Sequence, residues 1–240
     1  MGPSRTGGSS SSPTRGARGG DLVSNARRGR FITLEGPDGS GKTTAARHLA
    51  EWLRSRAEPT LLTGEPGGTP LGEEVRRLVL HERDVSDDLD PRADALLFAA
   101  ARAQHTARVI EPALKRGDNV VCARYLDSSL AYQGAAYGID VDEIRQLQRF
   151  ATYDTLPDMT ILVDVPVEVG LARKRRGPWN RFEDTEGERF FETVRAAYLA
   201  LAEAEPERYR VVDGSGSVDA TDAAIRGVVE PLVFSQSRPT

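Results

Sequence analysis

A glycine-rich segment near the start of the chain has the residue types and spacing of a phosphate-binding loop, Gly36-Pro37-Asp38-Gly39-Ser40-Gly41-Lys42-Thr43. Glycines let a backbone wrap a phosphate so that several N–H groups point at it, and a following helix N-terminus adds positive potential. At this spacing Lys42 would reach the β- and γ-phosphates of a nucleotide, and the Thr43 hydroxyl would be placed for Mg²⁺. The alternative is a mere turn before a helix. Because an apolar run precedes the segment and a helical pattern follows it, we predict binding of a nucleoside triphosphate.

Loops of this type occur in kinases, GTPases, motors and ATPase modules, and two observations narrow the choice. The chain contains no Asn-Lys-x-Asp sequence, which removes the usual guanine-reading loop. At 240 residues, 39% of them hydrophobic, it can form one ordinary domain with a sizeable core and is short for a motor. Phosphoryl transfer to a small molecule remains.

The segments that must position this loop alternate between strand and helix patterns. Buried-strand patterns lie at Phe31–Leu34, Thr60–Thr63, Val120–Cys122, Thr160–Val163 and Arg210–Val212. Helix-period patterns lie at residues 46–53, 75–79, 96–114, 144–147 and 190–201. This alternation predicts an α/β fold with a parallel sheet, helices on both faces, and ligands at the carboxyl ends of the strands.

Composition limits the remaining classes of protein. Residues 1–30, rich in Gly, Ser and Arg, predict a disordered basic tail, and residues 235–240 a disordered C-terminus, leaving one domain over 31–234. The tail holds six arginines against one aspartate, so the remainder carries a formal charge of −9, which argues against broad nucleic-acid binding. The lone Cys122 excludes an internal disulfide. With no apolar stretch of membrane-spanning length, we expect a cytoplasmic protein without nucleic-acid or membrane partners.

Several separated motifs resemble those of the thymidylate kinase family in its bacterial form, from about Phe31 to Val229. They are FITLEGPDGSGKTT, EPGGTPLGEEVR, LLFAAARAQH, RYLDSSLAYQG, LPDMTILVDVP and NRFE. The resemblance implies a three-layer α/β/α P-loop kinase fold with a five-stranded parallel sheet, usually a homodimer. It implies transfer of the γ-phosphate of ATP to dTMP, with Mg²⁺ as cofactor. The ATP-binding residues would be Gly36, Pro37, Asp38, Gly39, Ser40, Gly41, Lys42, Thr43 and Thr44, with Thr43 also a metal ligand.

The resemblance assigns the base of dTMP to two residue pairs with i, i+4 spacing. Phe98 and Arg102 share one helix face, and the resemblance implies that the ring stacks on thymine while the guanidinium hydrogen-bonds a base carbonyl. Ser129 and Gln133 are similar to the family's contacts with the base edge. Without the resemblance, Phe98 could be ordinary core, and the two polar residues a solvated face.

Cations would hold the phosphates. Arg76 and Arg124 look like the arginines that hold the dTMP phosphate, although either could be an exposed charge. The full set of expected substrate-binding residues is Asp38, Glu65, Arg76, Phe98, Arg102, Arg124, Ser129 and Gln133. The acceptor phosphate is already ionised, so no general base is needed, and catalysis would be electrostatic positioning of two anions. The expected catalytic residues are Lys42, Arg124 and Arg181.

Arg181 belongs to a segment with two interpretations. The run Arg173-Lys174-Arg175-Arg176 precedes the breaker Gly177-Pro178. It could be a helix end whose cations suit the negative end of the helix dipole. By resemblance, residues of about 173–183 form a lid that closes over the phosphates, and NRFE makes Arg181 the lid arginine.

Two residues depart from the family pattern. Ala123 stands where the family normally has an aspartate that helps to hold hydrated Mg²⁺, and Gly64 where it usually has an arginine. We expect the two positions to be neighbours, so that the absent groups would have paired. Loss of an outer-shell metal partner typically costs on the order of 10–100-fold in affinity or activity, which predicts an impaired kinase, with Glu35, Glu65 or Asp164 compensating in part. The alternatives are a non-catalytic nucleotide-binding protein and a kinase for another nucleoside monophosphate or deoxynucleoside.

Overall fold

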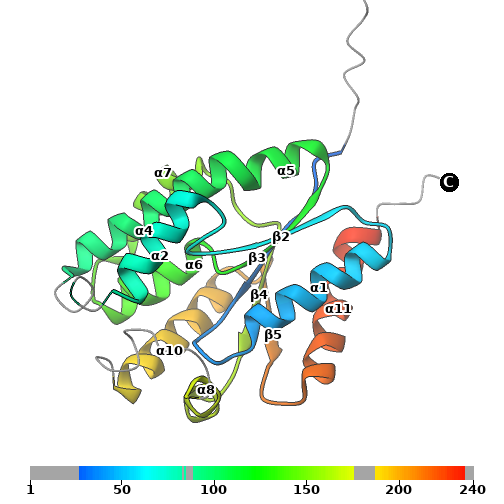
Figure 1. The fold of residues 1–240 in the computed structure, drawn as a ribbon. Helices are drawn as coiled ribbons and strands as arrows, with labels where there is room; N and C mark the ends of the chain where they lie inside the picture. Colours follow the sequence, from blue (N-terminus) through cyan, green and yellow to red (C-terminus); the bar gives the residue numbers. More distant parts are fainter. Residues whose placement is uncertain (1–26, 83, 85–88, 176–186, 236–240) are drawn as a thin grey trace, which may run out of the picture.

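The computed structural model describes residues 27–82, 84, 89–175 and 187–235. Its five strands form one parallel sheet in the order β2-β3-β1-β4-β5 (Figure 1). They are β1 Phe31–Glu35, β2 Thr60–Gly64, β3 Asn119–Ala123, β4 Met159–Asp164 and β5 Tyr209–Asp213. The five predicted strands are confirmed. Each extends slightly further than its apolar run, because polar end residues such as Glu35 and Asp164 still belong to the ladder.

Helices cover both faces of the sheet. On one face α1 (Lys42–Ser55) and α11 (Val218–Phe234) pack on strand residues such as Ile32 and Val163. On the other face Phe31 and Leu162 meet a larger helical layer (Figure 1). This layer contains α2 (Pro70–Leu80), α4 (Pro91–His105), α5 (Glu111–Arg116), α6 (Leu126–Ser129), α7 (Val141–Thr152), α8 (Val167–Lys174) and α10 (Glu188–Ala204). The predicted three-layer α/β/α fold is confirmed, because adjacent strand residues point into opposite layers.

Two helices that carry site residues, α2 and α4, begin at side-chain caps. The Thr69 hydroxyl accepts from Gly72 N–H at 3.0 Å at the start of α2, and the Asp90 carboxylate accepts from Arg92 N–H at 2.8 Å at the start of α4. Both helices have proline at their first turn, where the missing N–H costs nothing. These caps fix where α2 and α4 point toward the sheet edge.

Several helical segments differ from the sequence prediction. The stretch predicted as one helix over 96–114 is divided by π-helical residues Thr106–Ile110 between α4 and α5. A second π-helical segment, Leu130–Ala136, continues α6, and neither α6 nor this segment was predicted. The sequence prediction also missed α11, although Ile225, Val229 and Val233 recur at helical spacing and are buried.

The start of the described chain bears on the prediction that residues 1–30 form a tail. Residues 27–30, included in the predicted tail, are attached to the fold. Gly29 N–H donates to Leu114 O at 2.9 Å, and Arg28 forms an ion pair with Asp158 at 3.2 Å. Residues 1–26 and 236–240 lie outside the described residues. Within the described part, no helix is long and apolar enough to cross a membrane.

Candidate active site

The glycine-rich loop connects β1 to α1 at the carboxyl edge of the sheet, as predicted. Two of its glycines are needed for geometric reasons. Gly41 precedes α1 with φ 90°, and Gly39 has φ 77°. A Cβ on Gly39 would lie 1.9 Å from Gly170 O of α8, so only glycine allows this close approach. The loop therefore presents its backbone and the N-terminus of α1 to one side of the edge.

Lys42, the first residue of α1, is buried within this loop. Its Nζ donates to Pro37 O at 3.0 Å and lies 3.7 Å from Asp38 Oδ1. Burial and then the neighbouring Arg124 charge lower the pKa of Lys42 to about 7, against the smaller opposing effect of Asp38. An anionic phosphate would favour the charged form of this lysine.

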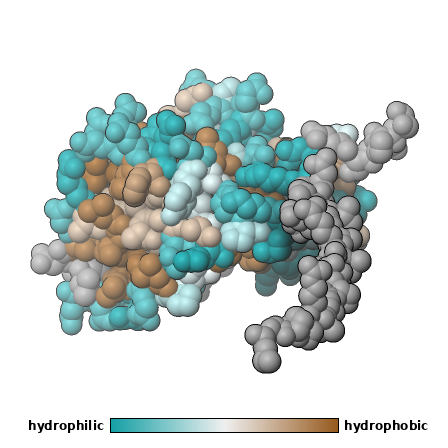
Figure 2. Space-filling view, turned by 90° about the horizontal axis from the view of Figure 1, so that it is seen from above, coloured by the Kyte–Doolittle hydropathy of each residue, from teal (hydrophilic) through white to brown (hydrophobic). Residues whose placement is uncertain are grey.

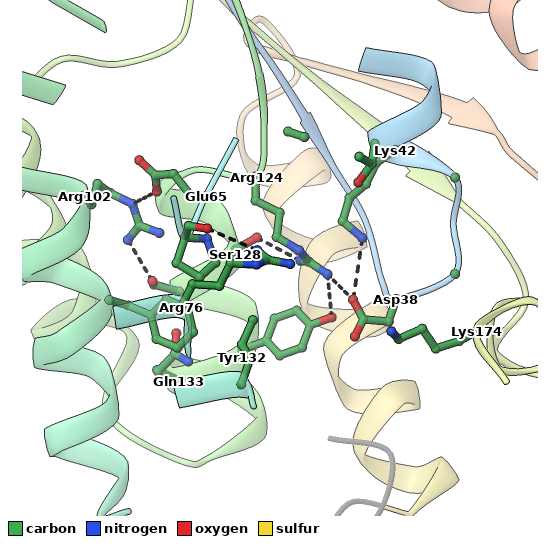
Figure 3. A pocket seen from close by; sticks show the side chains of 18 of the residues that line it. Asp38, Lys42, Glu65, Arg76, Arg102, Arg124, Ser128, Tyr132, Gln133 and Lys174 are labelled. Atoms are coloured by element: carbon green, nitrogen blue, oxygen red, sulfur yellow. Dashed lines mark hydrogen bonds and ion pairs between the residues drawn. The ribbon is translucent and has the colours of Figure 1, made fainter. Parts of the chain in front are cut away.

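A cavity of about 310 Å³ opens beside the loop (Figure 3). Six of the nine predicted ATP-binding residues line it, namely Asp38, Gly39, Gly41, Lys42, Thr43 and Thr44, whereas Gly36, Pro37 and Ser40 do not. All the expected substrate-binding residues line it as well, namely Asp38, Glu65, Arg76, Phe98, Arg102, Arg124, Ser129 and Gln133. Segments far apart in the sequence thus meet in one hollow at the strand ends.

Arg124 occupies the middle of this cavity wall. It follows β3 with φ 70°, a left-handed conformation that a non-glycine residue adopts at some cost. Its Nη2 donates to Asp38 and, at 3.3 Å, to the Tyr132 hydroxyl; its Nη1 donates to the Ser128 hydroxyl at 3.1 Å (Figure 3). The strained backbone and these contacts direct the guanidinium toward the glycine-rich loop.

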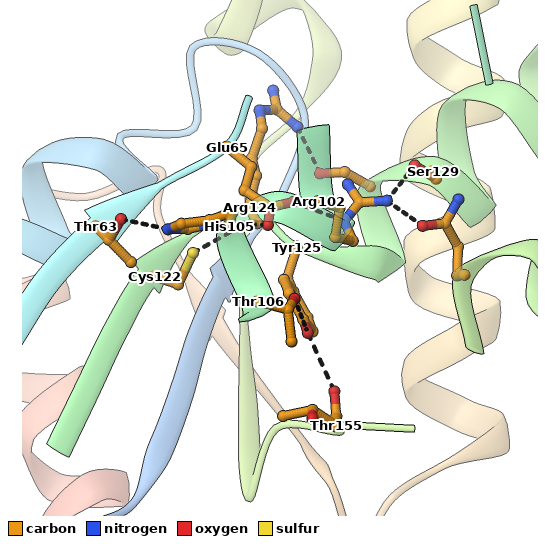
Figure 4. Close-up of polar contacts among 12 residues, drawn as sticks. Thr63, Glu65, Arg102, His105, Thr106, Cys122, Arg124, Tyr125, Ser129 and Thr155 are labelled. Atoms are coloured by element: carbon orange, nitrogen blue, oxygen red, sulfur yellow. Dashed lines mark hydrogen bonds and ion pairs between the residues drawn. The ribbon is translucent and has the colours of Figure 1, made fainter. Parts of the chain in front are cut away.

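Arg102 is fixed at the opposite end of the cavity. It is 2% exposed, and its Nε donates to Glu65 at 2.6 Å while Nη1 donates to the Ser129 hydroxyl at 2.8 Å and to Gln148 (Figure 4). Within the described residues these hydrogen bonds involve Nε and Nη1, and because Arg102 lines the cavity, Nη2 is the guanidinium nitrogen left to donate to a ligand. His105 holds the other oxygen of Glu65 at 2.9 Å. A buried set of acceptors thus orients one donor of Arg102.

Further side chains complete the lining. Gln133 Nε2 donates to Asp94 at 2.8 Å, which fixes the amide so that its carbonyl oxygen can accept from a ligand. Arg76 of α2 donates to Pro66 O at 3.1 Å. Phe98 is half-buried and lines the cavity one turn before Arg102 on α4, as the i, i+4 spacing predicted. One end of the cavity is therefore cationic, and the other combines an aromatic ring with directed donors and acceptors.

Comparisons with known proteins agree with this geometry. A family model described as thymidylate kinase matches residues 34–225. The thymidylate kinase of Leifsonia xyli is 51% identical over 206 residues, covering 85% of this chain and 96% of its own length. That of Pseudomonas putida is 48% identical over 207 residues, covering 84% and 97%. The chain belongs to the thymidylate kinase family. The crystal structure of thymidylate kinase from Ehrlichia chaffeensis matches with TM-score 0.69 and 33% identity, over 85% of this chain and 99% of that one.

Membership in the thymidylate kinase family confirms the predicted class of enzyme, a dTMP kinase with a P-loop fold. The structure also places the two positions at which the sequence was expected to depart from the family pattern. Gly64 and Ala123 are paired directly in the register of β2 and β3. A Cβ built on Gly64 lies 3.5 Å from the Ala123 Cβ. The expectation that the two positions are neighbours is therefore confirmed.

The carboxylates that could stand in for an aspartate at position 123 are already engaged. Glu65 is held by Arg102 and His105, and Asp164 forms a bidentate pair with Arg195 at 2.7 and 2.8 Å. Glu35 is fully buried, and burial followed by the charge of Asp127 raises its pKa. Only Glu65 of these three lines the cavity. The arrangement therefore gives no support to the expectation that these carboxylates compensate for Ala123.

The described residues include most of the basic run Arg173-Lys174-Arg175-Arg176. Arg173 and Lys174 lie in the last turn of α8, which matches the helix-end interpretation, and Arg173 donates to Gly214 O at 2.8 Å. Lys174 also lines the cavity (Figure 3). Arg181, the NRFE motif and the rest of the predicted lid lie outside the described residues.

Sequence reasoning missed three residues that line the cavity. Ser128 and Tyr132 belong to the quoted RYLDSSLAYQG motif, where only Arg124, Ser129 and Gln133 had been singled out. Their polar groups within a helical run of mostly buried residues were the available signal. Lys174 was noticed only as part of the basic run. A second hollow of about 190 Å³ adjoins the other side of the loop, and Ser40, Arg173 and Asp222 are among the residues that line it.

Proposed function

We propose that this protein transfers the γ-phosphate of ATP to dTMP, producing ADP and dTDP. The observation that carries this proposal is the single cavity that joins Lys42 and Thr43 of the phosphate-binding loop to Phe98 and Arg102. A donor phosphate at the loop and an acceptor base at the far end would place the acceptor phosphate between them, next to Arg124. Such placement is the main requirement of phosphoryl transfer.

The residues supply charge rather than acid–base chemistry. Two unit charges 4 Å apart repel by about 4 kcal/mol at an effective dielectric near 20, so two phosphates need cations between them. Lys42 and Arg124, which both contact Asp38, would supply this charge. Entering phosphate oxygens can replace the Asp38 carboxylate as their partner. Arg76 lines the same cavity and would neutralise the acceptor phosphate from α2.

The cavity chemistry suits thymine. The Phe98 ring offers a stacking surface, the Nη2 group of Arg102 offers a donor to a base carbonyl, and Gln133 offers a carbonyl acceptor to a ring N–H. A donor and an acceptor held at fixed positions distinguish bases by their hydrogen-bonding edge. We therefore infer preference for dTMP over cytidine and purine monophosphates.

Mg²⁺ is the expected cofactor, and the donor set fits it. Thr43 presents a hydroxyl oxygen at the cavity, and hard oxygen donors are what Mg²⁺ prefers. The described residues contain no group of three or more His, Cys, Asp and Glu side chains that could form a metal cage. Thr43 would hold the ion together with substrate phosphates and water, and the bound ion would neutralise phosphate charge. An aspartate at position 123 would strengthen such a site, so we propose that Ala123 makes this kinase slow.

A second candidate is a nucleotide-binding protein without turnover. The observation that favours it is the combined loss of a carboxylate and a guanidinium at the paired positions 123 and 64. Against it, the other cationic and base-facing residues expected from the family line the cavity together. A chain released from catalysis has no reason to keep this arrangement.

A homodimer is the proposed assembly. Figure 2 shows the molecule from the top of the view in Figure 1. On the face seen there, apolar residues gather toward one side. Phe150 on α7 is 83% exposed and Tyr153, directly after α7, is 67% exposed, and Leu96 on α4 is 58% exposed. Exposed apolar groups of this size favour burial against another protein surface. Light scattering should give twice the chain mass, and Phe150→Glu should give a monomer.

A substrate panel tests the function. ADP release is measured with ATP and Mg²⁺ and, in turn, dTMP, dUMP, dCMP, dGMP or thymidine. The proposal predicts turnover that is highest with dTMP. Equal rates with dCMP, or faster turnover of thymidine, would reject the assignment of the acceptor, whereas tight binding of both nucleotides without ADP release would favour the second candidate.

A further inference from the structure

Two hydroxyl groups connect a buried carboxylate to the cavity arginine. Ser128 Oγ donates to Glu35 Oε2 at 2.7 Å, and Tyr198 Oη donates to the same oxygen at 2.9 Å. Each hydroxyl oxygen also accepts from Arg124 Nη1, at 3.1 Å for Ser128 and 3.4 Å for Tyr198. A hydroxyl has one proton and two lone pairs, so a proton directed at Glu35 leaves the lone pairs for Arg124. The two hydroxyls also lie 2.9 Å from each other, so Glu35, Ser128, Tyr198 and Arg124 form one connected hydrogen-bond network.

Tyr198 is held rigidly in this arrangement. It is fully buried on α10, and its ring packs edge-on against Tyr132 with 6.5 Å between ring centroids. Arg195, one turn earlier on α10, pairs with Asp164 at the end of β4, while Glu35 ends β1. Because β1 and β4 are neighbours, α10 is attached to the sheet edge at two adjacent strands.

Tyr198 does not line the cavity, whereas Ser128 and Arg124 do. Any effect of Tyr198 on a ligand must therefore pass through neighbours that line the cavity, and Arg124 is the charged one among them. Burial raises the pKa of the Tyr198 hydroxyl well above its usual value, so the group keeps its proton and remains a donor to Glu35. On its other side the Arg124 guanidinium contacts Asp38 and Tyr132. Contacts on both sides define one orientation.

We propose that Tyr198, anchored by Glu35, is a positioning residue that holds Arg124 where the phosphate of the acceptor nucleotide binds. The inference rests on the proposed dTMP site and adds a residue to it from α10, 74 positions away from Arg124 in the sequence. Without the Tyr198 hydroxyl, Nη1 loses one acceptor and the guanidinium is drawn toward Asp38. The phosphate then meets a displaced cation, while the base end of the cavity is unchanged.

The test separates the phosphate from the nucleoside. Calorimetry measures the dissociation constants of dTMP and of thymidine for the parent and for Tyr198→Phe, which keeps the ring and removes the hydroxyl. We expect dTMP binding to weaken about 10-fold, the loss typical of a hydrogen bond to a charged group, and thymidine binding to change less than twofold. Tyr209→Phe is the matched control, because Tyr209 is also almost fully buried and its hydroxyl has no hydrogen-bond partner among the described residues.

Each outcome has a distinct meaning. Equal weakening of dTMP and thymidine in Tyr198→Phe, or no weakening of either, overturns the positioning role and leaves the proposed function standing. A parent that binds dTMP no better than thymidine overturns both. If Tyr198→Phe does not fold, Ser128→Ala removes the companion hydroxyl, and the same selective loss of dTMP binding would support the inference, whereas its absence would overturn it.

Discussion

Restoring the charged pair at positions 64 and 123 should change turnover by more than the two single substitutions together. The perturbations are Ala123→Asp, Gly64→Arg and the double variant. The two positions face each other in the register of β2 and β3, with 3.5 Å between the Ala123 Cβ and a Cβ built on Gly64. Side chains placed there can form an ion pair, although a Cβ at position 64 would lie 3.1 Å from Ala123 O and requires a small local shift.

The magnitude follows from this proximity. Opposite charges about 4 Å apart gain about 4 kcal/mol at an effective dielectric near 20. Ala123 is only 9% exposed, so desolvation of the carboxylate offsets part of this gain. Coupling between neighbouring residues is commonly 0.5–3 kcal/mol, and we expect about 1–3 kcal/mol here. The effect on kcat/KM should therefore exceed the product of the single effects by roughly 5- to 150-fold.

The assay is steady-state ADP release at saturating Mg²⁺ for the parent and the three variants. Ala123→Asp alone should raise kcat/KM by about 10–100-fold, the usual weight of an outer-shell metal partner. Ala123→Asn is the matched control, because it has the shape of aspartate without the charge and should show no coupling to Gly64→Arg. Effects of the two charged substitutions that simply multiply, within about twofold, would refute the reasoning.

Four further predictions concern the same cavity. ATP binding at pH 8 should be accompanied by uptake of close to one proton, because the pKa of Lys42 is about 7 in the free protein and rises next to phosphate. Calorimetry in buffers of different ionisation enthalpy measures the number of protons taken up. Persistence of the uptake in Lys42→Met would contradict its assignment to Lys42. Between pH 7 and 10.5 the unfolded chain binds more protons at this lysine, so its contribution makes the fold more stable as pH rises, and the pH dependence should be weaker in Lys42→Met. Phe98→Ala should raise KM for dTMP by roughly 5- to 150-fold through lost stacking of about 1–3 kcal/mol, with KM for ATP unchanged. An equal rise for both substrates would show a general loss of structure. Removal of Mg²⁺ with EDTA should abolish turnover and leave calorimetric binding of dTMP alone unchanged, and loss of dTMP binding would place the metal elsewhere.

Local patterns predicted the strands and the loop well, because both depend on nearby residues. The run Phe31–Leu34 is apolar except for Thr33, and the glycines after it are required by backbone geometry at Gly39 and Gly41. The neighbourhood of Gly64 and Ala123 was expected only from the strand order that the resemblance to thymidylate kinases implies. Their direct register pairing needed the structure, because one shift of register would separate them.

Contacts across the chain could not be predicted. Tyr198 lies in an apolar helical pattern with Val194 and Leu201, so the sequence favours ordinary core packing there. Its hydroxyl meets Glu35, 163 positions earlier, only because α10 returns to the strand that carries the loop. The division of residues 96–114 by a π-helical segment was equally hidden, because its buried residues Thr106 and Ile110 are four positions apart, a spacing that an α-helix also shows.

The central claim is that the γ-phosphate of ATP is transferred to dTMP. Phosphorus NMR of the protein with ATP, Mg²⁺ and dTMP identifies the product directly. The account predicts that the γ-phosphate signal of ATP is replaced by the β-phosphate signal of dTDP as ADP forms, slowly in the parent and faster in Ala123→Asp. ADP formation without dTDP, or binding of both nucleotides with no transfer at saturating Mg²⁺, would contradict it.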